Sequence, residues 1–277
     1  MAAPGVDAMA DSDADLERRF GGLRRLHGDA AYARLRAARV AVVGLGGVGS
    51  WAVEALARSG VGALTLIDMD HVAESNINRQ VQALGSTLGM AKAQALRVRV
   101  RDIHPGCRVI AVEDFASAEN WPALLPEPVD VVIDACDQVR AKAAIAAWAR
   151  AAGVVLVIVG AAGGKRLPQA IAVADLAEVT HDPLLASLRQ RLRKDHAAPR
   201  SGLIGLGCVY SREPVHRPAA EAADCAVDGS LNCHGYGSSV AVTATFGMVA
   251  ASEALRLFEA AAHRASSTRQ PTDAQPL

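Results

Sequence analysis

Residues 40–80 read VAVVGLGGVGSWAVEALARSGVGALTLIDMDHVAESNINRQ, and this stretch decides the fold. A short apolar run, residues 40–43, meets a glycine-rich turn, which is followed by a helical pattern and a second apolar run that ends at Asp68. Strand, glycine loop, helix, strand and terminal acid follow one another as in a nucleotide-binding βαβ unit. A tight strand–helix turn without a ligand is the alternative, and the acid at the expected distance disfavours it.

The glycines of this turn have separable roles. Gly44 permits the tight turn out of the strand, Gly46 lets a phosphate approach the backbone, and Gly49 lets the helix pack close to the strand. Together with Gly47 they form the predicted phosphate loop, because backbone N–H groups at the start of a helix face an anion. The carboxylate of Asp68 can accept hydrogen bonds from a ribose hydroxyl.

Two cations follow the acid. Arg79 comes after a loop rich in Asn and Ser, which favours turns, and Lys92 opens a predicted helix over residues 91–101. A dinucleotide site has no need of these cations, whereas a triphosphate site does, and Arg offers a fork while Lys offers a point charge. Taken singly, each fits an ordinary exposed cation. Behind a nucleotide loop, we interpret both as catalytic groups that bind phosphates.

A further buried-strand pattern, residues 129–133, ends in Asp134-Ala135-Cys136-Asp137. Carboxylates at the carboxyl end of a parallel strand face the ligand crevice, and Mg²⁺ on a triphosphate takes one or two protein carboxylates. Asp137 is therefore the predicted metal ligand, and Asp134 is expected to orient the loop. Alternatively, both acids cap the helix that begins near Val139.

Five motifs in this order and spacing resemble the ubiquitin-activating-enzyme-like adenylating family: GLGGVGS, LIDMD, SNINRQ, GMAKA and VVIDACDQVRAK. That family includes the ThiF-like adenylyltransferases that activate the sulfur carriers of molybdopterin and thiamine synthesis. Within it, the chain is most similar to a branch of bacterial dehydratases that act on threonylcarbamoyladenosine in tRNA. The residues that carry this similarity are RRFGG, NRQVQALGSTLGMAKA, AAGGKRLPQ, HDPLLASLRQRLRK and VTATFGMVAASEAL, and the resemblance covers residues 16–258.

The resemblance implies ATP-dependent activation of a carboxylate. Attack on the α-phosphate would give an acyl-adenylate, and ring closure within the substrate would then expel AMP with net loss of water. By position in the family, Asp68 would hold the ribose and Asp137 would bind Mg²⁺, with a monovalent cation as a candidate further cofactor. The other contacts to the nucleotide would come from Asp70, Asn76, Asn78, Arg79, Lys92 and Asp134. The alternative substrate is the C-terminus of a small ubiquitin-like sulfur-carrier protein.

Two departures from the family pattern concern partners. Gly22 stands where many relatives have an arginine that reaches the phosphates of the partner subunit, so Arg24 or Arg25 would have to replace it. The five cysteines form no CxxC pair, which disfavours both a structural zinc and the sulfur-carrier alternative. Cys233, beside His234, has the surroundings of a nucleophile, but ring closure within the substrate needs none, and an incidental loop thiol is the favoured interpretation.

Composition bounds the remaining questions. The 277 residues, 51% of them hydrophobic, suffice for one large α/β domain, expected as a Rossmann-like, doubly wound, mainly parallel sheet with a smaller α/β second half appended. A net charge of zero excludes a generally basic nucleic-acid binder, so a tRNA partner needs a local basic patch. Each candidate fits a solvated helix face equally well, and the last is favoured because it lies outside the nucleotide half. The candidates are Arg18, Arg19, Arg24 and Arg25; Arg97, Arg99 and Arg101; and Arg189, Arg191, Arg193 and Lys194.

We expect a single ThiF-like domain over residues 16–260, which begins with a helical segment (residues 16–38). A disordered tail (residues 1–15) precedes it and a polar tail (residues 261–277) follows. The apolar run over residues 240–258 contains two charges and reads as a buried or subunit-interface helix, not a membrane span. With scattered cysteines and no recognisable signal peptide, the prediction is a cytoplasmic homodimer, and a sulfur-acceptor or desulfurase-type protein is a candidate partner. The loop over residues 213–237 is long enough for a lid.

Overall fold

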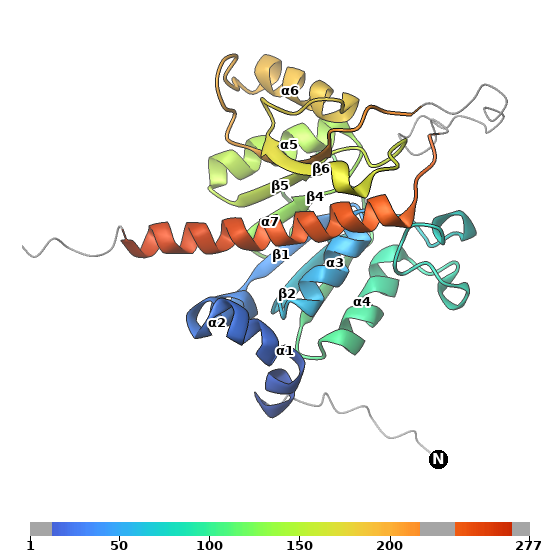
Figure 1. Cartoon of the computed structure of the whole chain (residues 1–277), viewed down its shortest axis with the longest axis vertical. Helices are drawn as coiled ribbons and strands as arrows, with labels where there is room; N and C mark the ends of the chain where they lie inside the picture. Colours follow the sequence, from blue (N-terminus) through green and yellow to red (C-terminus); the bar gives the residue numbers. More distant parts are fainter. Residues whose placement is uncertain (1–12, 217–235, 268–277) are drawn as a thin grey trace, which may run out of the picture.

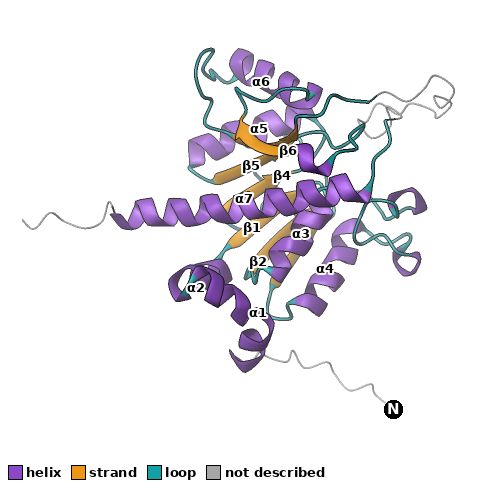
Figure 2. Cartoon of the chain, in the orientation of Figure 1, coloured by secondary structure: helices purple, strands orange, loops and turns teal. Residues whose placement is uncertain are grey.

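A seven-stranded sheet with the order β3-β2-β1-β4-β5-β7-β6 organises the computed structural model, which describes residues 13–216 and 236–267 (Figure 2). Adjacent strands are parallel except β6 and β7, which are antiparallel. The strands are β1 (Arg39–Val43), β2 (Ala63–Ile67), β3 (Arg108–Val112), β4 (Val131–Asp134), β5 (Val155–Val159), β6 (Ile171–Asp175) and β7 (Gly207–Ser211).

Helices cover both faces of this sheet. One face is covered by α3 (Gly49–Arg58), α4 (Lys92–Ile103) and α7 (Val240–Ser267), which pack on β1 and β2 side chains such as Val42 and Leu66. The other face is covered by α5 (Val139–Ala152) and α6 (Pro183–Asp195), which pack with Val43 and Ile67. Successive strand residues point to opposite faces, so an almost wholly apolar strand needs cover on both sides. The predicted doubly wound α/β class is confirmed.

The later part of the chain extends the same sheet. β7 pairs in parallel with β5, and β6 closes the edge by pairing antiparallel with β7. The appended second half that the sequence suggests consists of these two strands together with α6. β7 is missing from the strands that the sequence pattern predicts, and its five residues are largely buried between β5 and β6.

The helical segment predicted for residues 16–38 is two helices, α1 (Asp13–His27) and α2 (Asp29–Ala37). The break falls at Gly28, whose φ of 82° is a conformation that interrupts a right-handed helix. Phe20 of α1 packs on Tyr32 of α2. The side chain of Arg19 donates to the carbonyls of Asp102 and Ile103 at 3.2 and 3.0 Å, which ties α1 to the C-terminus of α4.

The long helix α7 lies across one face of the sheet beside α3 (Figure 1). A Cβ at Gly247 would lie 2.6 Å from Trp51 Cβ and from the carbonyl oxygen of Val48, so the close approach of α7 to α3 depends on this glycine. By length and composition alone α7 could cross a membrane, which is weak information for a single helix. Its fully buried Val242 and Phe246 belong to the core that faces the sheet, as expected for a packing helix.

Candidate active site

A cavity of about 730 Å³ lies where the carboxyl ends of β2, β1, β4 and β5 meet. This is the topological switch point of the sheet, because the chain builds β2 and β3 on one side of β1 and β4 and β5 on the other. Eight of the residues singled out in the sequence line the cavity: Gly44, Gly46, Gly47, Asp68, Asp70, Arg79, Lys92 and Asp137. Four others, Gly49, Asn76, Asn78 and Asp134, do not line it.

The glycine loop, residues 44–49, is shaped by close approaches between backbones. Gly44 has a φ of 84°, and a Cβ there would lie 2.8 Å from the carbonyl oxygen of Ala135. A Cβ at Gly49 would lie 1.8 Å from the carbonyl oxygen of Gly44, so this position holds helix α3 against the strand. A Cβ at Gly46, by contrast, would meet nothing within 4 Å. The open space at Gly46 is where a phosphate can reach the backbone.

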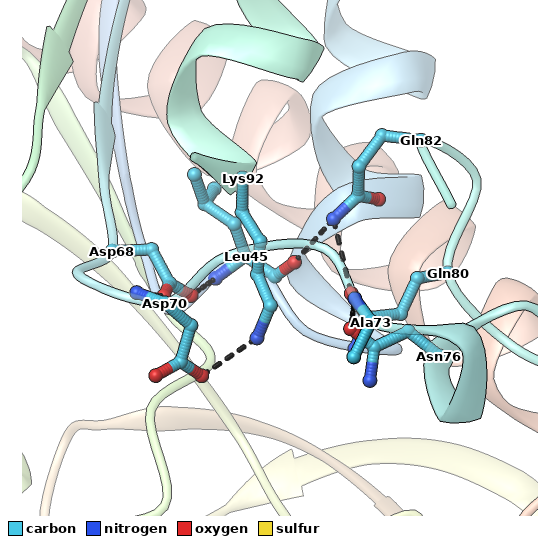
Figure 3. A network of polar contacts seen from close by, with 8 residues as sticks. All are labelled: Leu45, Asp68, Asp70, Ala73, Asn76, Gln80, Gln82 and Lys92. Atoms are coloured by element: carbon cyan, nitrogen blue, oxygen red, sulfur yellow. Dashed lines mark hydrogen bonds and ion pairs between the residues drawn. The ribbon is translucent and has the colours of Figure 1, made fainter. Parts of the chain in front are cut away.

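Both backbone polar groups of Leu45 are hydrogen-bonded to side chains (Figure 3). Its N–H donates to Asp68 Oδ2 at 2.6 Å, and its carbonyl accepts from Gln82 Nε2 at 3.0 Å. Gln82 Nε2 also donates to Gln80 Oε1 at 3.1 Å, and both glutamines are buried. Neither was among the predicted site residues. The signal available was two amides in an otherwise apolar stretch directly after Arg79, QVQA.

Asp68 combines a fixed position with access to the cavity. Its Oδ1 accepts from the N–H of Asp70 at 2.8 Å, while Oδ2 accepts from Leu45. Burial raises the pKa of the Asp68 carboxyl above its ordinary value, against the opposing effects of the Lys92 charge and of these two hydrogen bonds. A carboxylate fixed in this way, at the end of β2 and on the cavity wall, is suited to accept a ribose hydroxyl.

The two predicted cations reach the cavity from different supports. Lys92 begins α4, is buried, and places its Nζ 2.7 Å from Asp70 Oδ2 (Figure 3). Arg79 Nη1 donates to the carbonyl of Ser75 at 2.6 Å and to Asn78 Oδ1 at 2.9 Å. The carbonyl of Arg79 accepts from Trp51 Nε1 at 3.0 Å, which fixes its loop to α3.

Asn76 and Asn78 act on the loop that carries Arg79. Asn76 is buried, and its Oδ1 accepts from the N–H of Ala73 at 3.1 Å across the short 3₁₀ turn Glu74–Asn76. Asn78 Nδ2 donates to the carbonyl of Ser238 at 2.9 Å. Asn76 Oδ1 and both polar atoms of the Asn78 amide hold this loop, and neither side chain lines the cavity.

The two acids that follow the third buried-strand pattern have separate positions. β4 runs through Asp134, which is fully buried with Oδ1 3.2 Å from Nζ of the equally buried Lys142. Asp137 lies three residues beyond the strand on the cavity wall, and its carboxylate makes no hydrogen bond or ion pair within the described residues. The residue that caps α5 is Gln138, without a side-chain hydrogen bond, so the capping alternative for the two acids is wrong.

Beyond β5 the cavity has a wall that the sequence did not predict. It contains residues 160–163, the first turn of α6, and Tyr236. Asp182 caps α6 by accepting from the N–H of Leu185 at 3.0 Å, and it also accepts from the N–H of Ala161 at 2.8 Å. Burial raises the pKa of this carboxyl. Pro183 follows at the first position of α6, and the Asp182 side chain also ties this helix to the end of β5.

The predicted basic patches are largely engaged with the chain itself. In the favoured patch, Arg189 Nη1 donates to the carbonyls of Leu176 and Val179, each at 3.0 Å, and Arg193 Nε donates to that of Pro199. Elsewhere, Arg99 pairs with Glu54, and Arg24, a candidate for the missing family arginine, pairs with Glu17 and Asp29. These bonds leave the patches with fewer available donors than their sequence suggests.

Cys233 and the greater part of the predicted 213–237 loop lie outside the described residues. Among the residues that are described, no three His, Cys, Asp or Glu side chains cluster as metal ligands.

Comparison with known proteins gives the family. The ThiF family model matches residues 18–274. The tRNA threonylcarbamoyladenosine dehydratase of Escherichia coli is 44% identical over 256 residues, which cover 89% of this chain and 96% of that protein. The enzyme of the same name from Haemophilus influenzae is 42% identical over 254 residues, which cover 91% and 97%. The crystal structure of the E. coli enzyme in complex with ATP matches with a TM-score of 0.82, over 92% of this chain and 99% of that one. The chain belongs to the ThiF family.

Proposed function

We propose that this ThiF-family protein is an ATP-dependent dehydratase of threonylcarbamoyladenosine in tRNA. It adenylates the threonyl carboxylate of the modified nucleoside and closes it to a ring with loss of AMP. The observation that carries the proposal is a single cavity that joins the glycine loop, Asp68, Arg79, Lys92 and Asp137, in a chain that matches dehydratases along nearly its whole length. Nothing in the described residues favours the sulfur-carrier alternative.

The first step is adenylation. One oxygen of the substrate carboxylate bonds to the α-phosphorus of ATP, the bond from that phosphorus to its bridging oxygen breaks, and pyrophosphate leaves. Charge builds up on the phosphate oxygens, so the protein contributes by positioning and by electrostatic stabilisation. The glycine-loop N–H groups, Lys92 and Arg79 face those oxygens, and Asp68 holds the ribose.

Asp137 fits a magnesium ligand by its chemistry. Mg²⁺ at a nucleotide binds one or two protein carboxylates together with phosphate oxygens and water. A carboxylate on the cavity wall that has no hydrogen-bond or ion-pair partner among the described residues supplies that donor. When bound, the ion would neutralise charge on the phosphate oxygens. Asp134 has a structural role instead, since it is buried against Lys142 and supports the loop behind the cavity wall.

The second step is ring closure. A carbamoyl nitrogen or oxygen attacks the acyl carbon, the bond from that carbon to the AMP oxygen breaks, and the proton of the attacking group passes to solvent. AMP thus carries away the oxygen that the carboxylate has lost. Because attacking and attacked groups belong to one substrate, the protein needs to hold them in a reactive geometry and needs no nucleophile of its own. Cys233 therefore has no required part in either step.

The proposal includes a cytoplasmic homodimer. The outer side of α7 exposes Val240 and Met248, and apolar side chains on a packing helix favour cover by a second copy. Solution scattering at micromolar concentration measures the particle mass. A mass of one chain would contradict the dimer without affecting the proposed reaction. A sulfur-acceptor or desulfurase-type partner follows from the resemblance alone.

The reaction is tested with the purified chain, ATP, Mg²⁺ and two tRNA preparations, one that carries threonylcarbamoyladenosine and one that lacks it. We expect AMP release only with the modified tRNA, and a nucleoside lighter by one water after digestion. A Lys92→Met variant gives the background of each assay. AMP release without tRNA, or only with an added sulfur-carrier protein, would reject the dehydratase and favour the alternative substrate.

A further inference from the structure

The order of strands in the sheet gives the order of groups along the cavity. Asp68 and Asp70 follow β2, the glycine loop follows β1, Asp137 follows β4, and residues 160–163 follow β5. Since β2, β1, β4 and β5 are successive neighbours, these groups succeed one another in space from one end of the cavity to the other. The residues assigned above to the ribose, the phosphates and the metal therefore lie in a row with the last wall.

Charge is confined to one part of this row. Among the described lining residues, the charged ones are Asp68, Asp70, Arg79, Lys92 and Asp137. We call the remaining part the β5–α6 end; its lining residues are Gly160, Ala161, Ala162, Gly163, Pro183, Leu184, Val215, Tyr236 and Ser238. A surface of glycine, alanine, apolar and hydroxyl groups does not attract a polyphosphate. It suits an uncharged, flat group.

The inner wall of the β5–α6 end is thin and fixed. Residues 160–163 bring no side chain larger than a methyl group to the cavity. A Cβ at Gly160 would lie 2.1 Å from Asp182 Oδ2, so the wall cannot be thickened there. The bond from Ala161 to Asp182 and the buried Lys165, which donates to the carbonyls of His181 and Glu213, hold this segment from behind.

Tyr236 stands beside this thin wall, and hydrogen bonds hold the backbone of the two residues that follow it. A Cβ at Gly163 would lie 3.7 Å from Tyr236 Cβ, an ordinary packing distance. The N–H of Gly164 donates to the carbonyl of Gly237 at 2.9 Å, and Asn78 donates to the carbonyl of Ser238 at 2.9 Å. The aromatic residue of this end is thus held between the β5 loop and the loop that carries Arg79.

We propose that the β5–α6 end binds the purine of threonylcarbamoyladenosine, with Tyr236 as the stacking residue that selects a nucleobase. The inference rests on the proposed dehydratase function and assigns its substrate subsite. Proteins that read single unpaired bases stack them on aromatic rings. A purine at this end leaves its carbamoyl-threonyl arm directed along the row, toward Asp137 and the glycine loop, where the carboxylate meets the α-phosphate.

The test measures binding of the free nucleoside threonylcarbamoyladenosine to protein saturated with a non-hydrolysable ATP analogue, which keeps the nucleoside out of the ATP site. Tyr236→Leu should weaken this binding roughly 5- to 150-fold, the loss of one base–aromatic stack. Tyr236→Phe and Tyr236→Trp should retain it. N-carbamoylthreonine, which lacks the purine, should bind all four proteins alike, and affinity for ATP should not change.

A matched variant at the opposite end separates stacking from general damage. Phe115 lies beyond β3, on the side of Asp68, and also lines the cavity. Phe115→Leu should weaken ATP binding and leave nucleoside binding to the ATP-loaded protein unchanged. Nucleoside affinity that is equal in wild type and Tyr236→Leu, or absent in wild type, would overturn the subsite. A Tyr236-dependent nucleoside affinity without turnover of modified tRNA would keep the subsite and reject the proposed function.

Discussion

Two lysine–aspartate pairs flank the glycine loop, and their surroundings differ. Lys92 and Asp70 are 2.7 Å apart on the cavity wall, where the aspartate side chain is 64% exposed and the lysine side chain 7%. Lys142 and Asp134 are 3.2 Å apart beneath the loop over residues 135–138, and both side chains are 0% exposed. Lys142 also donates to the carbonyls of Asp134 and Val159, each at 3.0 Å.

Exposure decides what each pair can do. A pair with one partner in solvent gains little stability, and an arriving phosphate can share its lysine. A pair that is wholly buried loses its hydration, and it persists only where further hydrogen bonds satisfy the charges. Burial would lower the pKa of Lys142, but the nearby Asp134 outweighs burial and raises it. The buried pair therefore fixes the ends of β4 and β5 and the loop that presents Asp137, while the wall pair meets the ligand.

Removing the buried cation should give the largest effect. Lys142→Met leaves Asp134 charged and unpaired in the core, so we expect a loss of about 3–5 kcal/mol in the free energy of unfolding. Urea denaturation measures this loss. Lys92→Met is the matched control, with a change within about 1 kcal/mol, because Asp70 stays solvated. Equal stability of Lys142→Met and Lys92→Met would contradict the different roles assigned to the two pairs. The double variant Lys142→Met with Asp134→Leu should recover most of the loss.

For turnover we expect a large effect at the pair on the cavity wall, although its effect on stability is small. Lys92→Met removes a cation that faces the transferring phosphate, so we expect kcat to fall about 10²–10³-fold, by analogy with loss of one donor to a developing oxyanion. Arg150→Met, which removes an exposed cation on α5 outside the candidate tRNA patches, is the control and should retain the wild-type rate. Normal turnover by Lys92→Met would place that lysine outside the chemistry.

Asp137 tests whether the loop above the buried pair carries the metal. Asp137→Asn keeps the shape of the side chain and removes its charge. Since loss of a residue that only supports a ligand weakens metal affinity about 10–100-fold, loss of the ligand should raise the Mg²⁺ concentration for half-maximal AMP release at least about tenfold. Titration of Mg²⁺ at saturating ATP gives this value, with exposed Glu178→Gln as the control. An unchanged Mg²⁺ requirement would leave Asp137 without a metal role.

The same pairs show which parts of the site can be predicted from sequence. The glycine loop, Asp68 and the start of α4 at Lys92 are encoded locally, by glycine spacing and apolar periodicity. Asp134 is different, because its polarity ended the predicted strand at Ile133 whereas β4 continues through it. Asp134 can be a buried strand residue because Lys142, on the next helix, neutralises it. The apolar periodicity of a single segment cannot predict an ion pair with a residue of another element.

The β5–α6 end of the cavity was missed for a similar reason. Its wall combines residues 160–163, α6 and Tyr236, which become neighbours only when β7 enters the sheet between β5 and β6. The bond from Leu185 to Asp182 is local to the start of α6, but the bond from Ala161 to Asp182 depends on that packing. Local signals predict elements and loops, and contacts between distant segments determine the cavity.

The smallest expected effect concerns the uncharged hydrogen bond from the Gln82 amide to the Leu45 carbonyl in the glycine loop. Gln82→Leu removes the donor to the Leu45 carbonyl and keeps a side chain of similar size, while Asp68 still holds the Leu45 N–H. Loss of one hydrogen bond costs about 1 kcal/mol, so affinity for ATP should fall roughly fivefold, because the loop is then held at one end only. Calorimetric titration with ATP gives the affinity, and urea denaturation shows whether the fold is also weakened.

Thr87 supplies the control, because its hydroxyl donates to the carbonyl of Gln82 at 2.6 Å. Thr87→Val removes this bond to the Gln82 backbone but leaves the Gln82 amide in place, and it should bind ATP like wild type. If Thr87→Val and Gln82→Leu weaken ATP binding equally, the loop is held by its backbone as a whole, and the glutamine amide has no separate part in shaping the phosphate site.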